Sequence, residues 1–114
     1  MKIFITGVAG FLGSHLADLM LSQGHTVAGN DNMIGGYTDN VPQDVEFHQI
    51  DCCDLENMTK AMEGCDIVYH TAATAYEGLS VFSPVLVTRN IFEASVTTIT
   101  VSYTHLTLPT KRIV

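Results

Sequence analysis

Three glycines, Gly7, Gly10 and Gly13, lie between a short apolar run and an amphipathic segment. The apolar run predicts a strand, and the segment that continues to Gln23 predicts a helix. The N-terminus of a helix can hold a phosphate, because its N–H groups are unpaired and carry the positive end of the helix dipole. Gly7 would supply the tight turn, Gly10 the close approach of a pyrophosphate, and Gly13 the close packing of helix on strand. The spacing predicts a dinucleotide phosphate site, with glycines kept for packing alone as the alternative.

An acidic residue follows the second apolar run at the distance that such a site requires. Residues 26–30 predict a strand that leads into Asp31 and Asn32, and Asp31 lies 18 residues beyond Gly13, close to the ~20 that such a site has. A carboxylate at this point accepts hydrogen bonds from both hydroxyls of the adenosine ribose and repels a 2′-phosphate. Asp31 therefore favours NAD over NADP, and a solvated aspartate in a turn is the alternative.

Composition limits the classes of partner. The chain has 114 residues, a size typical of one small domain, and 46% of them are hydrophobic, so a packed core is expected. The net charge of -7 argues against nucleic acid or an anionic membrane surface as a partner. No apolar run reaches the ~18 residues of a membrane span, and the N-terminus has no signal-peptide pattern.

Three cysteines, Cys52, Cys53 and Cys65, are an odd number and lack the spacing of a metal site. We therefore expect small reduced thiols, no bound metal and a cytoplasmic location.

Strand and helix patterns alternate along the chain with short connections. Strands are expected at residues 2–6, 26–30, 45–50 and 66–70. Helices are expected at residues 12–23, 55–63 and 84–100. This alternation predicts an α/β fold of the Rossmann type, with a parallel sheet in the order 3-2-1-4.

The apolar positions of each expected helix should face the sheet. In the first helix they are Leu12, Leu16, Leu19 and Met20. In the second they are Leu55, Met58, Ala61 and Met62, with Asp54 as N-cap. In the third they are Leu86, Ile91, Phe92, Val96 and Ile99, with Ser83 as N-cap and Pro84 as first residue.

The fourth expected strand ends in small residues, which run from Thr71 to Ala75. Small side chains there leave room for a ligand over the carboxyl edge of the sheet. Packing against the glycine turn would explain them equally well.

With these motifs in order, residues 1–100 resemble the extended short-chain dehydrogenase/reductase family, the NAD-dependent epimerase/dehydratases that act on nucleotide sugars. The family opens with a strand and T-G-x-x-G-F/Y-[IL]-G-S-H, which stands here at residues 6–15. The D-N after its second strand stands at Asp31 and Asn32, and its D-x-x-D-L at residues 51–55. Its V-x-H-x-A-A/G stands at residues 68–73, and its N-[VI] at Asn90 and Ile91.

The resemblance implies NAD as cofactor and assigns a role to each matching position. The pyrophosphate would be lined by Gly7, Gly10, Phe11, Leu12 and Gly13. The adenosine ribose would be held by Asp31 and Asn32, and the adenine bordered by Asp51 and Cys52. The phosphates and the nicotinamide ribose would lie along Thr71, Ala72, Ala73 and Ala75, with Asn90 approaching from the last helix.

The family's catalytic residues have no counterpart here. Such enzymes carry a Tyr-x-x-x-Lys after a fifth strand, and none of Tyr37, Tyr69, Tyr76 and Tyr103 has a lysine four residues later. The substrate domain is also absent. The resemblance therefore implies the NAD-binding part of a nucleotide-sugar epimerase or dehydratase, truncated before strand five and inactive alone. In the full-length parent it implies a nucleotide-sugar substrate and a possible homodimer.

Two other functions stay open. One is a non-catalytic module that binds or senses a dinucleotide. The other is an NADP-linked carbonyl reductase of the same superfamily, against which Asp31 argues.

The composition changes at Val101, beyond which there is no glycine and no acidic residue. Residues 101–110 read V-S-Y-T-H-L-T-L-P-T, the translation of a common transposon-end sequencing adapter. We therefore expect residues 101–114 to be a non-native tail, with a natural C-terminal segment as the alternative.

Overall fold

A four-stranded parallel sheet forms the centre of the molecule, in the order β3-β2-β1-β4. The computed structural model describes residues 1–73 and 81–105. The strands are β1 (Lys2–Thr6), β2 (Thr26–Asn30), β3 (Glu46–His48) and β4 (Ile67–His70). Ile3 of β1 stands opposite Val27 on one side and Ile67 on the other. The expected parallel fold and strand order are confirmed, and the strand expected at 45–50 is shorter than predicted.

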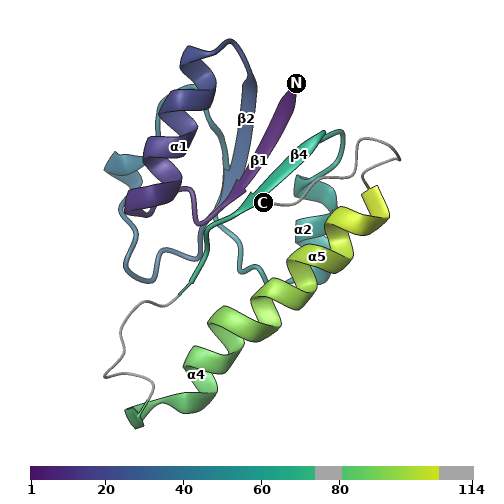
Figure 1. Ribbon diagram of the computed structural model, residues 1–114. Helices are drawn as coiled ribbons and strands as arrows, with labels where there is room; N and C mark the ends of the chain where they lie inside the picture. The colour runs from purple at the N-terminus through teal and green to yellow at the C-terminus, as the bar shows by residue number, and fades with distance from the viewer. Residues whose placement is uncertain (74–80, 106–114) are drawn as a thin grey trace.

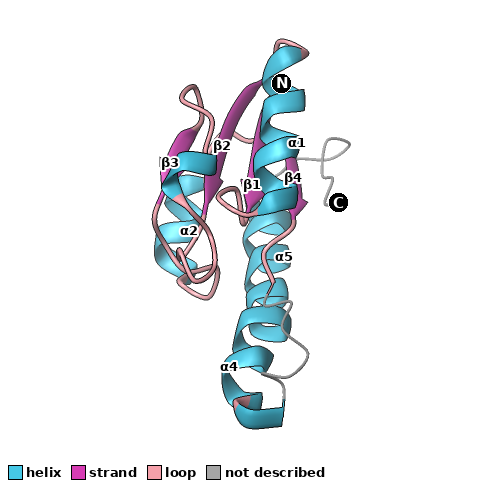
Figure 2. Cartoon of the chain, turned by 90° about the vertical axis from the view of Figure 1, so that its left-hand side faces the viewer, coloured by secondary structure: helices cyan, strands magenta, loops and turns pink. Residues whose placement is uncertain are grey.

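Helices cover both faces of this sheet (Figure 1). They are α1 (Phe11–Ser22), α2 (Leu55–Ala61), α4 (Pro84–Thr88) and α5 (Ala94–His105), with a 3-10 turn, η1 (Thr38–Asn40), and a π-helical segment, η2 (Arg89–Glu93). α1 lies on one face, and α2 and α5 lie on the other. Figure 2 shows α4, η2 and α5 as one long rod that extends past the carboxyl end of the sheet. α5 crosses residue 100, where we placed the start of the tail, and that boundary stays a prediction.

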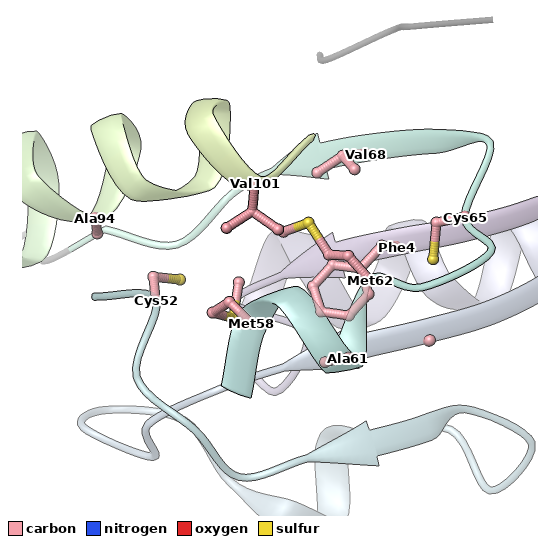
Figure 3. Close-up of a cluster of buried hydrophobic side chains, with 10 residues drawn as sticks. Phe4, Cys52, Met58, Ala61, Met62, Cys65, Val68, Ala94 and Val101 are labelled. Atoms are coloured by element: carbon pink, nitrogen blue, oxygen red, sulfur yellow. The ribbon is translucent and has the colours of Figure 1, made fainter. Parts of the chain in front are cut away.

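The alternation of side chains along β1 divides the core into two layers. Ile3 and Ile5 face α1, where they pack with Val8, Ala17 and Val27. The opposite layer contains Phe4, Ala28, Cys52, Met58, Ala61, Met62, Cys65, Val68, Ala94 and Val101. Figure 3 shows Phe4 of β1 beside Met62, which follows α2, with Val101 of α5 above them. β1 is therefore the strand around which both layers form.

The expected faces of the helices are wrong at several positions. Leu12 and Leu19 of α1 and Leu55 of α2 are exposed, although Met58, Ala61 and Met62 are buried as expected. The residues of α1 that are buried are Gly13, Ser14 and Ala17. α1 starts on the glycine turn, so the side toward the turn must carry small residues.

The expected face of the last helix is also wrong. Leu86, Ile91, Phe92, Val96 and Ile99 are all exposed. Instead, the buried residues of the rod are Val101 and four small or polar ones, Asn90, Ala94, Thr98 and Ser102. Four of these recur every fourth residue, so they form one line along the helix and let it approach the sheet closely.

The predicted N-cap of α2 and the predicted glycine after α1 are confirmed. Asp54 is the N-cap of α2, and its carboxylate accepts a hydrogen bond from the backbone N–H of Asn57. Gly24 follows α1 with a φ of 86°, the left-handed conformation that suits glycine. Within residues 1–73 and 81–105, no helix has both the length and the apolar character needed to cross a membrane.

Candidate functional site

The glycine turn joins the carboxyl ends of three strands. Gly7 has a φ of 71°, and its N–H donates to the carbonyl oxygen of Asn30 at the end of β2, at 2.8 Å. A Cβ at Gly7 would lie 2.9 Å from the backbone nitrogen of Ala72, which follows β4. Only glycine meets both conditions without strain. The predicted tight turn at Gly7 is confirmed.

Gly13 and Gly10 control how closely α1 approaches the turn. A Cβ at Gly13 would lie 2.2 Å from the carbonyl oxygen of Gly7, so Gly13 is required for the helix to pack there. A Cβ at Gly10 would lie 3.3 Å from the same oxygen. Gly10 is also the N-cap of α1, and it has no side chain to cap the first N–H groups. These N–H groups are therefore free of a capping side chain, as an incoming anion requires.

Asp31 lies at the end of β2, beside the turn, and is 8% exposed. One carboxylate oxygen accepts a hydrogen bond from the backbone N–H of Ala9 at 3.1 Å, and the other from the N–H of Met33 at 2.8 Å. Each oxygen keeps a second acceptor direction. Asp31 thus fixes the glycine turn to the next loop and can still accept from a ligand hydroxyl.

A cavity of about 250 Å³ opens over these groups. Nine predicted site residues line it, Ala73 among them; the others are Gly7, Gly10, Phe11, Leu12, Gly13, Asp31, Asn32 and Thr71. Ile34, Gly35 and Gly36 of the loop after β2 line it as well. Phe11 and Leu12 are largely exposed, at 81% and 65%. The cavity therefore has the free end of α1 on one wall and a carboxylate on another.

A smaller hollow continues from this cavity toward α5. It is lined by the predicted residues Asn32, Asp51, Cys52, Ala73 and Asn90, and by Asn30, Ile34 and Ala94. Asn32, Ile34 and Ala73 border both spaces. The two spaces therefore adjoin at the carboxyl edge of the sheet, where open α/β sheets bind their ligands.

Cys52 contributes to the smaller hollow from a buried position. The side-chain amide of Asn30 donates to its sulfur at 3.4 Å and to the carbonyl oxygen of Ile50 at 2.9 Å. Burial raises the pKa of the Cys52 thiol. The thiol is therefore neutral near pH 7 and acts as a packing group rather than a nucleophile.

The segment after β4 is held against β1 by the hydroxyl of Thr6. Its oxygen accepts from the N–H of Thr71 at 3.1 Å and from the N–H of Ala72 at 3.2 Å. The Thr71 hydroxyl donates in return to the carbonyl oxygen of Thr6 at 2.6 Å. Both alternatives for these small residues apply in part, because Ala72 packs on Gly7 while Thr71 and Ala73 line the cavity.

Sequence reasoning missed part of the site. Ile34, Gly35 and Gly36 line the cavity, and the Gly-Gly pair after Asp31 was the available signal. The motif that contains Thr6 gave no sign that its hydroxyl holds the segment after β4. Ala75 lies outside the described residues. Within the described part of the chain, no three His, Cys, Asp or Glu side chains gather in a way that could hold a metal ion.

Comparison with known protein families identifies the class of protein to which this chain belongs. The model of the NAD dependent epimerase/dehydratase family matches residues 3–111. The chain belongs to this family. The resemblance stated from the motifs is therefore confirmed.

Particular relatives include a UDP-glucose 4-epimerase of Corynebacterium glutamicum, 36% identical over 84 residues, which cover 74% of this chain and 26% of that protein. A GDP-mannose 3,5-epimerase of Arabidopsis thaliana is 37% identical over 76 residues, or 64% of this chain and 19% of that protein. The chain thus spans about a fifth to a quarter of the length of these relatives.

Solved structures of epimerases support the same family assignment. The UDP-glucose 4-epimerase of Thermotoga maritima, solved with UDP-glucose, superposes with a TM-score of 0.89 at 29% identity, covering 92% of this chain and 35% of that one. The UDP-glucose 4-epimerase of Thermus thermophilus, solved in complex with NAD, gives 0.85 at 32% identity, covering 92% and 34%. The likeness therefore extends over nearly all of this chain and about a third of each enzyme.

Proposed function

We propose that this chain is the NAD-binding part of a nucleotide-sugar epimerase or dehydratase. The observation that carries the proposal is one cavity that combines the uncapped N-terminus of α1 with the buried carboxylate of Asp31. An anionic pyrophosphate fits the first feature, and a ribose with two free hydroxyls fits the second. The names of the relatives support the nucleotide-sugar part of the proposal.

Two adjoining spaces at the carboxyl edge of the sheet could take the two ends of an extended dinucleotide. Gly10 leaves the phosphate end open, because a side chain there would meet the carbonyl oxygen of Gly7 and narrow the approach. Asn32 and Ala73 line both the main cavity and the smaller hollow, where Asp51 would border the adenine. Bound NAD would supply a two-electron acceptor for the substrate carbon. The residues of this chain bind and orient the dinucleotide.

Binding without turnover is the expected behaviour of the chain by itself. The 114 residues contain no Tyr-x-x-x-Lys, so the acid/base pair of the family's chemistry has no counterpart in them. This same feature favours the second candidate, a module that binds a dinucleotide without catalysis. The continuation of the reading frame distinguishes the two, because only an enzyme requires Tyr-x-x-x-Lys downstream.

Calorimetric titration of the chain with NAD, NADP and UDP-glucose tests the proposal. We expect saturable binding of NAD, at least about tenfold weaker binding of NADP, and no conversion of the nucleotide sugar. Gly10→Ala should lower the affinity for NAD by about tenfold or more, since it places a methyl group where the phosphate must approach.

Gly24→Ala is the matched control. Gly24 lies at the other end of α1, and a Cβ there would meet nothing within 4 Å. Its left-handed φ makes the variant less stable, but its affinity for NAD should not change. Equal affinities of wild type and Gly10→Ala would reject the assignment of the phosphate end.

A further inference from the structure

A chain of side-chain hydrogen bonds crosses the sheet beneath the proposed site and ends on α5. The Thr6 hydroxyl lies 2.7 Å from Nδ1 of His70, and Nε2 of His70 lies 2.9 Å from the hydroxyl of Ser95. Ser95 in turn donates to the carbonyl oxygen of Ile91. His70 thus joins the end of β1 to α5, the last part of the rod formed by α4, η2 and α5.

The hydrogen bonds at Nδ1 and at Nε2 of His70 require the same form of the imidazole. The Thr6 oxygen already accepts from the N–H groups of Thr71 and Ala72, so its remaining group is the proton, which it donates to Nδ1. The Ser95 hydroxyl gives its proton to the Ile91 carbonyl, so it can only accept from Nε2. The ring must therefore be neutral, with its proton on Nε2.

We infer that His70 is a positioning residue of the dinucleotide site: through the Thr6 hydroxyl it holds Ala72 against Gly7 while its ring is the neutral Nε2–H tautomer. Thr71 is tied in addition to the carbonyl oxygen of Thr6. A protonated ring would direct an Nδ1–H at the Thr6 oxygen, which has no acceptor direction left. Thr6 would then have to release one of its two backbone partners. The floor of the phosphate site would loosen, because Ala72 is the residue against which Gly7 packs. The effect on ligand binding rests on the proposed function, but the effect on the protein does not.

Few charged side chains surround the His70 ring, so its protonation depends mainly on its burial and on the groups in direct contact with it. Among the described elements, β1 and α5 have the most extensive contacts with β4. On β1 the charged side chain is Lys2, at the far end of the strand. η2 carries Arg89 and Glu93, which border a separate surface groove, and the titratable group of α5 with a described side chain is Tyr103, which is 67% exposed. Burial of the ring lowers the pKa of His70, in agreement with a neutral imidazole.

Long-range 1H–15N correlation spectra of the whole 114-residue chain test the tautomer without any ligand. At neutral pH we expect Nδ1 of His70 to have the shift of an unprotonated nitrogen and Nε2 that of a protonated one. On acidification the backbone amide signals of Thr71 and Ala72 should follow the titration of the ring. An Nδ1–H tautomer, or Thr71 and Ala72 amides that do not follow the ring, would overturn the inference.

Separate variants test the hydrogen bond between Thr6 and His70 and the one between His70 and Ser95. Thr6→Ser keeps the hydroxyl and should behave as wild type, while Thr6→Val should uncouple the Ala72 amide from the ring. Ser95→Ala should leave Ala72 coupled to the ring and uncouple the amides around residue 95 of α5. Ser22→Ala is the matched control, since Ser22 makes only an exposed bond to the Leu19 carbonyl within α1. If Thr6→Val does not fold, the Thr6→Ser and Ser95→Ala spectra still decide the inference.

A pH series of NAD titrations tests the link to the site. In wild type, affinity should fall at least about fivefold as the pH is lowered from about 7.5 through the titration of His70 seen in the spectra, which lies below the ordinary histidine range because burial lowers the pKa of the ring. If NAD binds with no pH dependence over this range, His70 has no positioning role in binding. If NAD binds at no pH while the amides of Thr71 and Ala72 follow the ring, the proposed function fails and the role of His70 in the fold stands.

Discussion

Asp31 accepts a hydrogen bond from the backbone N–H of Ala9, at 3.1 Å, across 22 residues of sequence. The carboxylate that is suited to a ribose is thus also the group that fixes the middle of the glycine turn. Its second oxygen accepts from the N–H of Met33, a residue with a φ of 69°. Asp31 therefore holds an otherwise unfavourable loop conformation in place beside the cavity.

Replacing Asp31 should affect stability and cofactor preference separately. Asp31→Asn removes the charge and leaves one of the two N–H groups without its acceptor, at a cost of about 1–3 kcal/mol in the free energy of unfolding. It should also raise the affinity for NADP relative to NAD by about tenfold, because no carboxylate then repels a 2′-phosphate. Chemical denaturation and calorimetry measure the two effects. Asp44→Asn, on an exposed residue, is the control, and an unchanged NADP/NAD ratio in Asp31→Asn would place the ribose elsewhere.

Gly13→Ala should lower the free energy of unfolding by more than the small size of the added methyl group suggests. The added methyl group would meet the Gly7 carbonyl oxygen at 2.2 Å, and this oxygen belongs to the backbone and cannot rotate away. We expect a loss of about 3 kcal/mol or more in the free energy of unfolding. Gly64→Ala adds the same methyl group in open space at a φ of 79°, and should cost about 1 kcal/mol. Similar losses for the two variants in urea titrations would contradict the packing argument.

Thr98→Val should stabilise the chain. Thr98 is fully buried on the sheet-facing line of α5, and among the described residues its hydroxyl has no hydrogen bond of adequate geometry. The Cys52 thiol, a weak partner, lies near it. Valine has nearly the same shape and no unsatisfied oxygen, so we expect a gain of about 1 kcal/mol. Thr100→Val, which removes an exposed hydroxyl bonded to the Val96 carbonyl, should give no gain in the same denaturation experiment.

Alkaline pH should destabilise the core through Cys65. Burial raises the pKa of this thiol from 9.0 to about 11, so the unfolded chain loses the proton first. The stabilisation is complete below about pH 9 and is lost as the pH rises toward 11, by roughly 2–3 kcal/mol. Unfolding free energies of wild type and Cys65→Ala across this range should converge as the pH rises. Parallel curves would show that Cys65 ionises equally in both states.

The strands could be predicted because their sequences allow little else. β1 and β2 have the predicted limits, since each has a short run of apolar or small residues between polar or glycine-rich segments, as strands buried on both faces do. The faces of the helices could not be predicted from apolar periodicity, because the rod of α4, η2 and α5 carries large apolar residues outside its buried line. The usable signal was the recurrence of Asn90, Ala94, Thr98 and Ser102 at every fourth position.

The main part of the site could be predicted because its residues follow strand ends directly. Parallel strands bring their carboxyl ends together, so Gly7, Asp31 and Thr71 had to meet once the strand order was known. The chain from Thr6 through His70 to Ser95 could not be predicted in this way. It depends on the register of β1 against β4 and on the rotation of α5, which no short motif encodes.

The position of β1 at the centre of the sheet has a consequence for synthesis on the ribosome. β1 is translated before both of its neighbours, and Ile5 finds its partners only at Gly29 and then at Tyr69. At elongation rates of about 5–20 residues per second, the apolar strand waits several seconds for β4. During that time it is a natural target for chaperones and for pairing with other nascent chains, so the yield of folded protein should depend on how fast residues 6–70 are translated.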